Sequence, residues 1–114
     1  MAILNREYLS EMTGGDIQID AQLYEVFVAS TSDYLDQIKA AQTPEERKKA
    51  IHRLKGAAAN VGAEDLADAC RQGEEVAFEE NEEKWVVAAL AIFEAYKKVA
   101  LEMMRFIRSA KTQG

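Results

Sequence analysis

The sequence predicts an all-α protein, an antiparallel up-and-down four-helix bundle with a short N-terminal helix that caps one end. The chain has one proline and six glycines against 19 alanines, so it lacks the turn residues that a sandwich or barrel requires. Apolar residues recur at helical spacing along segments joined by short connections. The 114 residues, 48% of them apolar, fit one domain over 1–114 with its own core.

Five helices are expected, at approximately 3–13, 20–42, 44–60, 64–80 and 82–110. Gly14-Gly15-Asp16 stops the first helix, and Asp20 is the expected N-cap of the second. The apolar contacts of the first helix are Ile3, Tyr8, Leu9 and Met12. The apolar stripe of the second comprises Leu23, Val26, Phe27, Tyr34, Leu35 and Ile38.

The third helix has the clearest start signal in the chain. Thr43 can cap it, Pro44 suits its first position, and Glu46 completes a capping box. Its expected core stripe is Ile51, Leu54, Ala58 and Val61, and Gly62 ends it.

The last two helices complete the bundle. The expected inner face of the fourth helix is Leu66, Ala69, Cys70, Gly73, Val76 and Ala77. Asn81 is expected to cap the fifth helix, whose inner residues are Trp85, Ala89, Ile92, Tyr96, Val99, Met103 and Phe106.

Charge and composition limit the function. A net charge of -6 disfavours binding to nucleic acid or to an anionic membrane. The single cysteine excludes an internal disulfide and fits a reducing compartment. We find no apolar run long enough to span a bilayer and no signal-peptide pattern, so we expect a cytoplasmic protein. Four long helices can close their own core, which makes a monomer the default expectation.

One group of residues carries the chemistry. His52 is the only histidine, and it lies at the edge of the inward face that Ile51 and Leu54 define. Lys55, Gly56 and Ala59 follow three, four and seven positions later, on the same side of the helix. Each of these residues alone has an ordinary structural explanation. Together they describe an imidazole with open space and a cation beside it, which suits a phosphoryl carrier.

This segment resembles the histidine-containing phosphotransfer (HPt) domain family. His52-Arg53-Leu54-Lys55-Gly56 followed by Gly62 is similar to the family signature H-x-x-K-G-x-x-x-x-x-G, and the similarity continues through Ala63, Leu66, Cys70 and Glu74. The resemblance implies a four-helix bundle whose histidine accepts a phosphoryl group from an aspartyl phosphate on one receiver domain and passes it to another. It also implies no cofactor on this chain, with Mg²⁺ only on the receiver, and partners that are response regulators or hybrid histidine kinases.

Glu74 is a further candidate on geometric grounds. His52 and Glu74 are each 11 positions from residue 63, at the turn between their helices, so they lie level in an antiparallel hairpin. Glu74 could accept a hydrogen bond from Nδ1–H of His52 and leave Nε2 as the nucleophile. Alternatively, it belongs to an acidic face that only interacts with solvent. By the same register Cys70 lies level with Gly56, where a small packing residue is the better interpretation than a catalytic thiol.

A basic patch surrounds the histidine. Five of the 14 cations, Arg47, Lys48, Lys49, Arg53 and Lys55, fall within nine residues. Of these, Lys48, Lys49 and Arg53, together with Ala59, are the candidate docking residues for an acidic receiver pocket.

Other functions fit the sequence less well. A di-metal bundle needs Glu-x-x-His pairs that one histidine cannot supply, and no catalytic triad or Gly-rich phosphate loop occurs, so we expect no ATP site and no autophosphorylation. The remaining alternatives are a helical docking module that is never phosphorylated, and a dimerising histidine-kinase phosphoacceptor domain. Gly56 and the basic patch favour the phosphotransfer interpretation over the kinase domain, whereas incubation with a phosphorylated receiver domain would separate it from the docking module.

Overall fold

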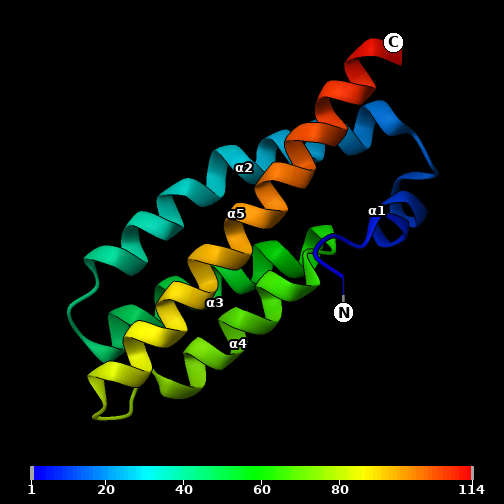
Figure 1. Ribbon diagram of the computed structural model, residues 1–114. Helices are drawn as coiled ribbons and strands as arrows, with labels where there is room; N and C mark the ends of the chain where they lie inside the picture. Colours follow the sequence, from blue (N-terminus) through cyan, green and yellow to red (C-terminus); the bar gives the residue numbers. More distant parts are fainter. Residues whose placement is uncertain (1, 114) are drawn as a thin grey trace.

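The computed structural model describes residues 2–113, and all of its regular structure is helical (Figure 1). The helices are α1 (Arg6–Thr13), α2 (Ile17–Ala40), α3 (Pro44–Val61), α4 (Glu64–Val76) and α5 (Glu82–Gln113). The fold class predicted from the sequence is therefore confirmed. No helix among the described residues is long and apolar enough to cross a membrane.

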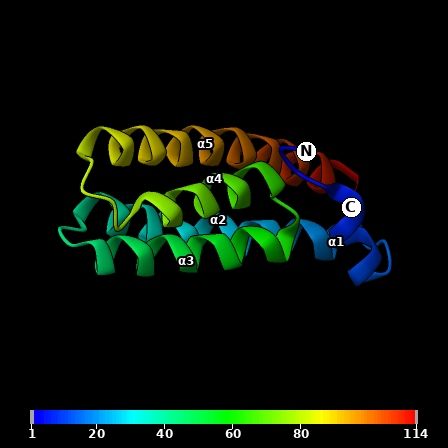
Figure 2. The ribbon, with the colours of Figure 1, turned by 90° about the horizontal axis from the view of Figure 1, so that it is seen from below.

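The four long helices form a ring in which each packs on two neighbours. Both α2 and α4 pack against α3 on one side and α5 on the other, so α3 and α5 occupy opposite corners. Figure 2 shows these two helices at opposite edges of the bundle. The short α1 packs across the end of α2 and α3. The result is an elongated molecule of 50 × 23 × 18 Å.

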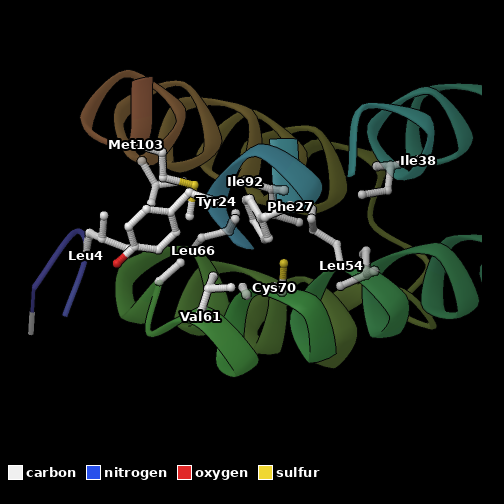
Figure 3. Close-up of a cluster of buried hydrophobic side chains, with 14 of the residues drawn as sticks. Leu4, Tyr24, Phe27, Ile38, Leu54, Val61, Leu66, Cys70, Ile92 and Met103 are labelled. Carbon is white, nitrogen blue, oxygen red and sulfur yellow. The ribbon is translucent and has the colours of Figure 1, made fainter. Parts of the chain in front are cut away.

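The core is built from side chains that all four long helices contribute. Tyr24, Phe27, Leu54, Leu66 and Met103 are buried and converge between the helices (Figure 3). In α3 the predicted stripe of Ile51, Leu54, Ala58 and Val61 is buried as expected. The α2 prediction is partly wrong, because Leu23 and Val26 are exposed while Tyr24 and Thr31 take the inner positions.

The N-terminal segment differs from its prediction. Helix α1 begins at Arg6 instead of residue 3, because the Asn5 side chain caps it by accepting a hydrogen bond from the Tyr8 amide. The residues before it bind the α3–α4 turn, where the Asn5 amide donates to the Gly62 carbonyl over 2.8 Å. Of the expected apolar contacts only Leu9 is fully buried, while Tyr8 and Met12 are exposed.

The predicted N-cap of α2 is wrong. Asp16 caps the helix by accepting from the amides of Gln18 and Ile19, so α2 starts at Ile17. Asp20 is fully buried one turn later, where it accepts a hydrogen bond from Thr13 Oγ1 and pairs with Arg6 at 3.4 Å. Its carboxylate ties α1 to α2 because a buried charge needs such partners.

The remaining helix ends are close to their predictions. Thr43 caps α3 as expected, but the Glu46 carboxylate accepts from the Gln42 amide instead of the amide of the cap residue. Gly14 and Gly62 end α1 and α3 in the left-handed conformation, at φ 74° and 77°. Helix α2 ends at Ala40 instead of residue 42, and α5 continues to Gln113 instead of 110.

Helix α4 is one turn shorter than predicted. It ends at Val76 instead of residue 80, because the chain must reverse there to start α5. The amide of Lys84 donates to the Asn81 side chain, which caps α5 as expected.

Candidate functional site

The candidate site lies on the outer side of α3. Two residues of α3, Ile51 and Leu54, are fully buried and hold that helix against the core. His52 is turned about 100° away from Ile51 and its side chain is 71% exposed. The side chain of His52, the only histidine of the chain, is therefore accessible to a partner, while the backbone of His52 is held against the core.

Glu74 on α4 lies beside this histidine. Its Oε1 atom is 3.4 Å from Nδ1 of His52 and 2.9 Å from Nζ of Lys55. The Glu74 side chain is only 14% exposed, so its carboxylate is fixed at the edge of the core. One carboxylate oxygen thus faces both the imidazole nitrogen and the lysine ammonium, and Nε2 is the imidazole nitrogen that Glu74 leaves uncontacted.

Gly56 borders the site one turn further along α3. A Cβ built on Gly56 would meet no atom of the described residues within 4 Å, so no neighbouring helix needs this glycine. Gly73 is different, because a Cβ there would lie 3.0 Å from Ile92 Cδ1 and 3.1 Å from Ile51 Cδ1. The chain therefore contains one helical glycine that serves internal packing and another that leaves space outside. Ala59 is also exposed, and its small side chain extends this open surface by about another turn of α3.

The predicted basic patch is only partly available. Lys48, Lys49 and Arg53 are exposed, although Arg53 donates a hydrogen bond to Gln37 over 3.1 Å. Arg47 is directed into the bundle, where it pairs with Glu82 at 3.0 Å and its side chain is 14% exposed. Its guanidinium lies 4.5 Å from the centre of the Trp85 ring. Arg47 therefore fastens α3 to α5 and is not part of the open surface.

Phe78 is a site residue that the sequence analysis missed. It follows the end of α4, is 52% exposed, and has Nζ of Lys48 5.5 Å from its ring centre. With Glu45, Lys48, Lys49, His52 and Arg53 it lines a shallow hollow of about 420 Å³ beside the imidazole. The sequence did contain a signal for it: Phe78 is an aromatic residue four positions after Glu74, and it lies outside the apolar stripe of the predicted helix 64–80.

Cys70 lies beneath the site and is fully buried. Burial, reinforced by the nearby Glu74 carboxylate, raises the pKa of its thiol to about 12. A thiol that keeps its proton is a poor nucleophile, so Cys70 is a packing residue as the sequence indicated. Among residues 2–113, no three His, Cys, Asp or Glu side chains are grouped as metal ligands would be.

Comparison with known families gives a match over most of the chain. Residues 22–108 match the Hpt domain family, and this range contains His52, Lys55, Gly56 and Glu74. The chain belongs to the Hpt domain family. The resemblance drawn from the signature around His52 is therefore confirmed, and α1 lies outside the matched range.

Two solved structures share the fold of this Hpt domain. The histidine-containing phosphotransfer protein ZmHP2 from maize aligns with a TM-score of 0.79 at 15% identity, over 97% of this chain and 86% of that chain. A rice protein assigned to the histidine-containing phosphotransfer proteins aligns with a TM-score of 0.71 at 14% identity, over 96% of this chain and 85% of that chain. A comparison with curated protein sequences gives no significant match.

Proposed function

We propose that this Hpt domain is a phosphorelay intermediate whose His52 accepts a phosphoryl group from the aspartyl phosphate of one receiver domain and passes it to another. The observation that carries this proposal is the exposed imidazole whose Nδ1 faces the Oε1 atom of Glu74 at 3.4 Å. Membership of the family supports histidine phosphotransfer in a phosphorelay.

The transfer is a displacement at phosphorus. The lone pair on Nε2 of His52 attacks the phosphorus of the aspartyl phosphate, an N–P bond forms, and the bond from phosphorus to the carboxylate oxygen breaks. The aspartate leaves as a carboxylate with the bonding electron pair. Nδ1 keeps its proton, and the adjacent Glu74 carboxylate stabilises the positive charge that develops on the ring. The same steps in reverse deliver the phosphoryl group to the second receiver.

Lys55 and Gly56 act on the incoming group. In the free protein the Lys55 ammonium is held by Glu74 at 2.9 Å and is still 30% exposed. A phosphoryl group on His52 offers it a second anion within one helical turn, so Lys55 can stabilise the charge on the phosphoryl oxygens. The empty space above Gly56 allows the receiver to bring its aspartate close to the imidazole.

The partner surface follows from the exposed residues around the histidine. Lys48, Lys49 and Arg53 offer positive charge to the carboxylates that surround a receiver's active aspartate, and Phe78 offers an apolar contact in the same hollow. Mg²⁺, which the reaction needs to neutralise charge, is expected on the receiver and not on this chain. A buried, reduced thiol at Cys70 fits the cytoplasmic location that we propose.

Phosphotransfer from labelled receiver domains tests this proposal. Purified receivers of the same organism, carrying a radiolabelled aspartyl phosphate, are mixed with the wild-type chain and with His52→Gln. We expect label on the wild-type protein that is lost in acid and retained in base, no label on His52→Gln, and unchanged circular dichroism. Because the chain has a single histidine, phosphohistidine can form only at His52.

The controls separate the alternatives. Labelled ATP alone should leave the wild-type chain unlabelled, whereas self-labelling would indicate a kinase-type domain. A docking module would bind receivers without ever receiving label. Retained labelling of His52→Gln, or failure of every receiver to label the wild type, would overturn the proposal.

A further inference from the structure

The outer face of α5 carries large apolar side chains that no part of the described chain covers. Ile92 and Val99 bind this helix to the core and are fully buried. On the opposite face Val87, Leu90, Leu101 and Met104 are between 49% and 67% exposed. We call these four residues, with the charged residues between and beside them, the α5 seam. Several large apolar side chains aligned along one exposed helix face are typical of an interaction surface.

The seam has the spacing of a coiled coil. Its residues are separated alternately by three and four positions, as at the a and d positions of a heptad. In order they are Glu83, Val87, Leu90, Glu94, Lys97, Leu101, Met104 and Arg108, and all are exposed. The core residues Ile92 and Val99 fall at the f position of this heptad, which is opposite the seam. One set of regularly spaced residues on α5 therefore faces the bundle, and a second set, the seam, faces outward.

The seam is also self-complementary when it is read in the reverse direction. About the midpoint between Ala95 and Tyr96, every seam residue has a counterpart at equal distance on the other side. The resulting apolar pairs are Val87 with Met104 and Leu90 with Leu101, and the resulting charge pairs are Glu94 with Lys97 and Glu83 with Arg108. Two antiparallel copies of α5 related by a twofold axis at this midpoint would match apolar with apolar and acid with base in every layer.

A parallel arrangement would lack this match. It would place Glu94 against Glu94 and Lys97 against Lys97 of the second copy, which repel. Within residues 2–113, none of the four charged seam residues makes an ion pair, whereas Lys84 and Lys111 beside them pair with Glu79 and Glu25. The seam charges are therefore available to a second copy.

Two shallow hollows lie at the ends of the seam. One of about 520 Å³ includes Val76, Val87 and Ala91, and one of about 420 Å³ includes Met104 and Arg108. The antiparallel register brings the Met104 end of one copy over the Val87 end of the other, so each hollow faces the opposite hollow of the second copy. The charge pairs, and not the hollows, therefore decide the register.

We propose that two copies of this chain associate through the α5 seam as an antiparallel homodimer. The expectation of a monomer rested on a bundle that closes its own core, and the seam lies outside that core. Because α5 and α3 are at opposite corners of the bundle, both copies of His52 remain on the outside of the dimer. Residues 83–108 span roughly 37 Å at ~1.5 Å per residue, a single helix pair, so the dimer is expected to be weak and concentration-dependent.

Charge reversal at the centre of the seam tests both the contact and its register. Glu94→Lys alone places four lysines at the dyad, and Lys97→Glu alone places four glutamates there. Sedimentation of the full-length wild type from about 10 µM to about 1 mM should show a mass that rises towards that of a dimer, and each single variant should weaken association roughly tenfold or more. The exposed Glu75→Lys on α4 changes charge equally outside the seam and should sediment as the wild type does.

The register is tested by complementation. An equimolar mixture of Glu94→Lys and Lys97→Glu restores both charge pairs and should form a heterodimer, and the double variant Glu94→Lys/Lys97→Glu should dimerise again. A wild type that stays monomeric throughout the range, or single variants that associate as the wild type does, would overturn the proposal. A mixture that fails to associate would also overturn the proposal, whereas a mixture that associates more tightly than the wild type would indicate a parallel pair, whose like charges the mixture relieves. All of these variants should keep phosphotransfer, so this outcome is independent of the chemistry at His52.

Discussion

Replacing Gly56 with alanine measures directly what the glycine beside His52 is for. If the glycine served packing, a methyl group would collide with a neighbouring helix. A Cβ at this position meets no atom of the described residues within 4 Å, so the free protein gains helix propensity without a clash. We therefore expect Gly56→Ala to stabilise the free domain while it impairs transfer from a receiver.

The stability gain can be estimated from helix propensity. Alanine is favoured over glycine in a helix interior by ~1 kcal/mol. A 114-residue domain unfolds with an entropy of about 0.24 kcal/mol/K, so the melting temperature should rise by about 4 °C. In the complex the added atoms would overpack the contact with the receiver at a cost of ~1–3 kcal/mol, equivalent to roughly fivefold to 150-fold slower transfer. The bulkier Gly56→Gln should lose more transfer with little change in folding.

Gly73 supplies the matched control. The same substitution there adds the same propensity but brings Cβ to 3.0 Å from Ile92 Cδ1 and 3.1 Å from Ile51 Cδ1. Thermal melts should therefore place Gly73→Ala below Gly56→Ala, since overpacking opposes the gain. Rapid-quench transfer assays complete the comparison. A lower melting temperature for Gly56→Ala, with normal transfer by the folded protein, would refute the clearance argument.

Three further predictions concern the residues around the histidine. Lys55→Ala should slow transfer in a quench assay but leave the melting temperature nearly unchanged, since a partly exposed ion pair contributes ~0–1 kcal/mol; unchanged kinetics would reduce Lys55 to surface charge. Glu74→Ala should lower the population of the Nδ1–H tautomer of His52 in nitrogen–proton NMR spectra, and an unaltered spectrum would exclude the orienting role. Cys70 should resist iodoacetamide at pH 8 until the domain unfolds, because burial raises its pKa from 9.0 to about 12. Since the folded thiol binds its proton more tightly, stability should decrease as pH rises above 9, and rapid labelling of the native protein would contradict the burial.

Local sequence determined the helices and most of the site. Thr43 and Pro44 start α3, and Gly62 ends it in the left-handed conformation, because caps and glycines act through neighbouring backbone groups. The apolar period of α3 placed Ile51 inside and left His52 at the edge. Counting from the turn placed Glu74 level with His52, since an antiparallel hairpin has a fixed register.

Only the tertiary structure decided between residues that local rules treat alike. Asp16 and Asp20 are both suitable N-caps, and the choice follows from Arg6 and Thr13, which bury Asp20. The basic run gives no sign that Arg47 is held by Glu82, 35 positions away along the chain.

The same limit applies to the surface. The end of α4 at Val76 and the exposure of Phe78 beside His52 depend on where the chain reverses to begin α5. Periodicity identified the inner face of α5 but did not show that the opposite face stays uncovered. Patterns in the sequence specify interactions within a few residues, whereas burial, ion pairing and exposure depend on which distant segments pack together, and only the folded chain brings those segments into contact.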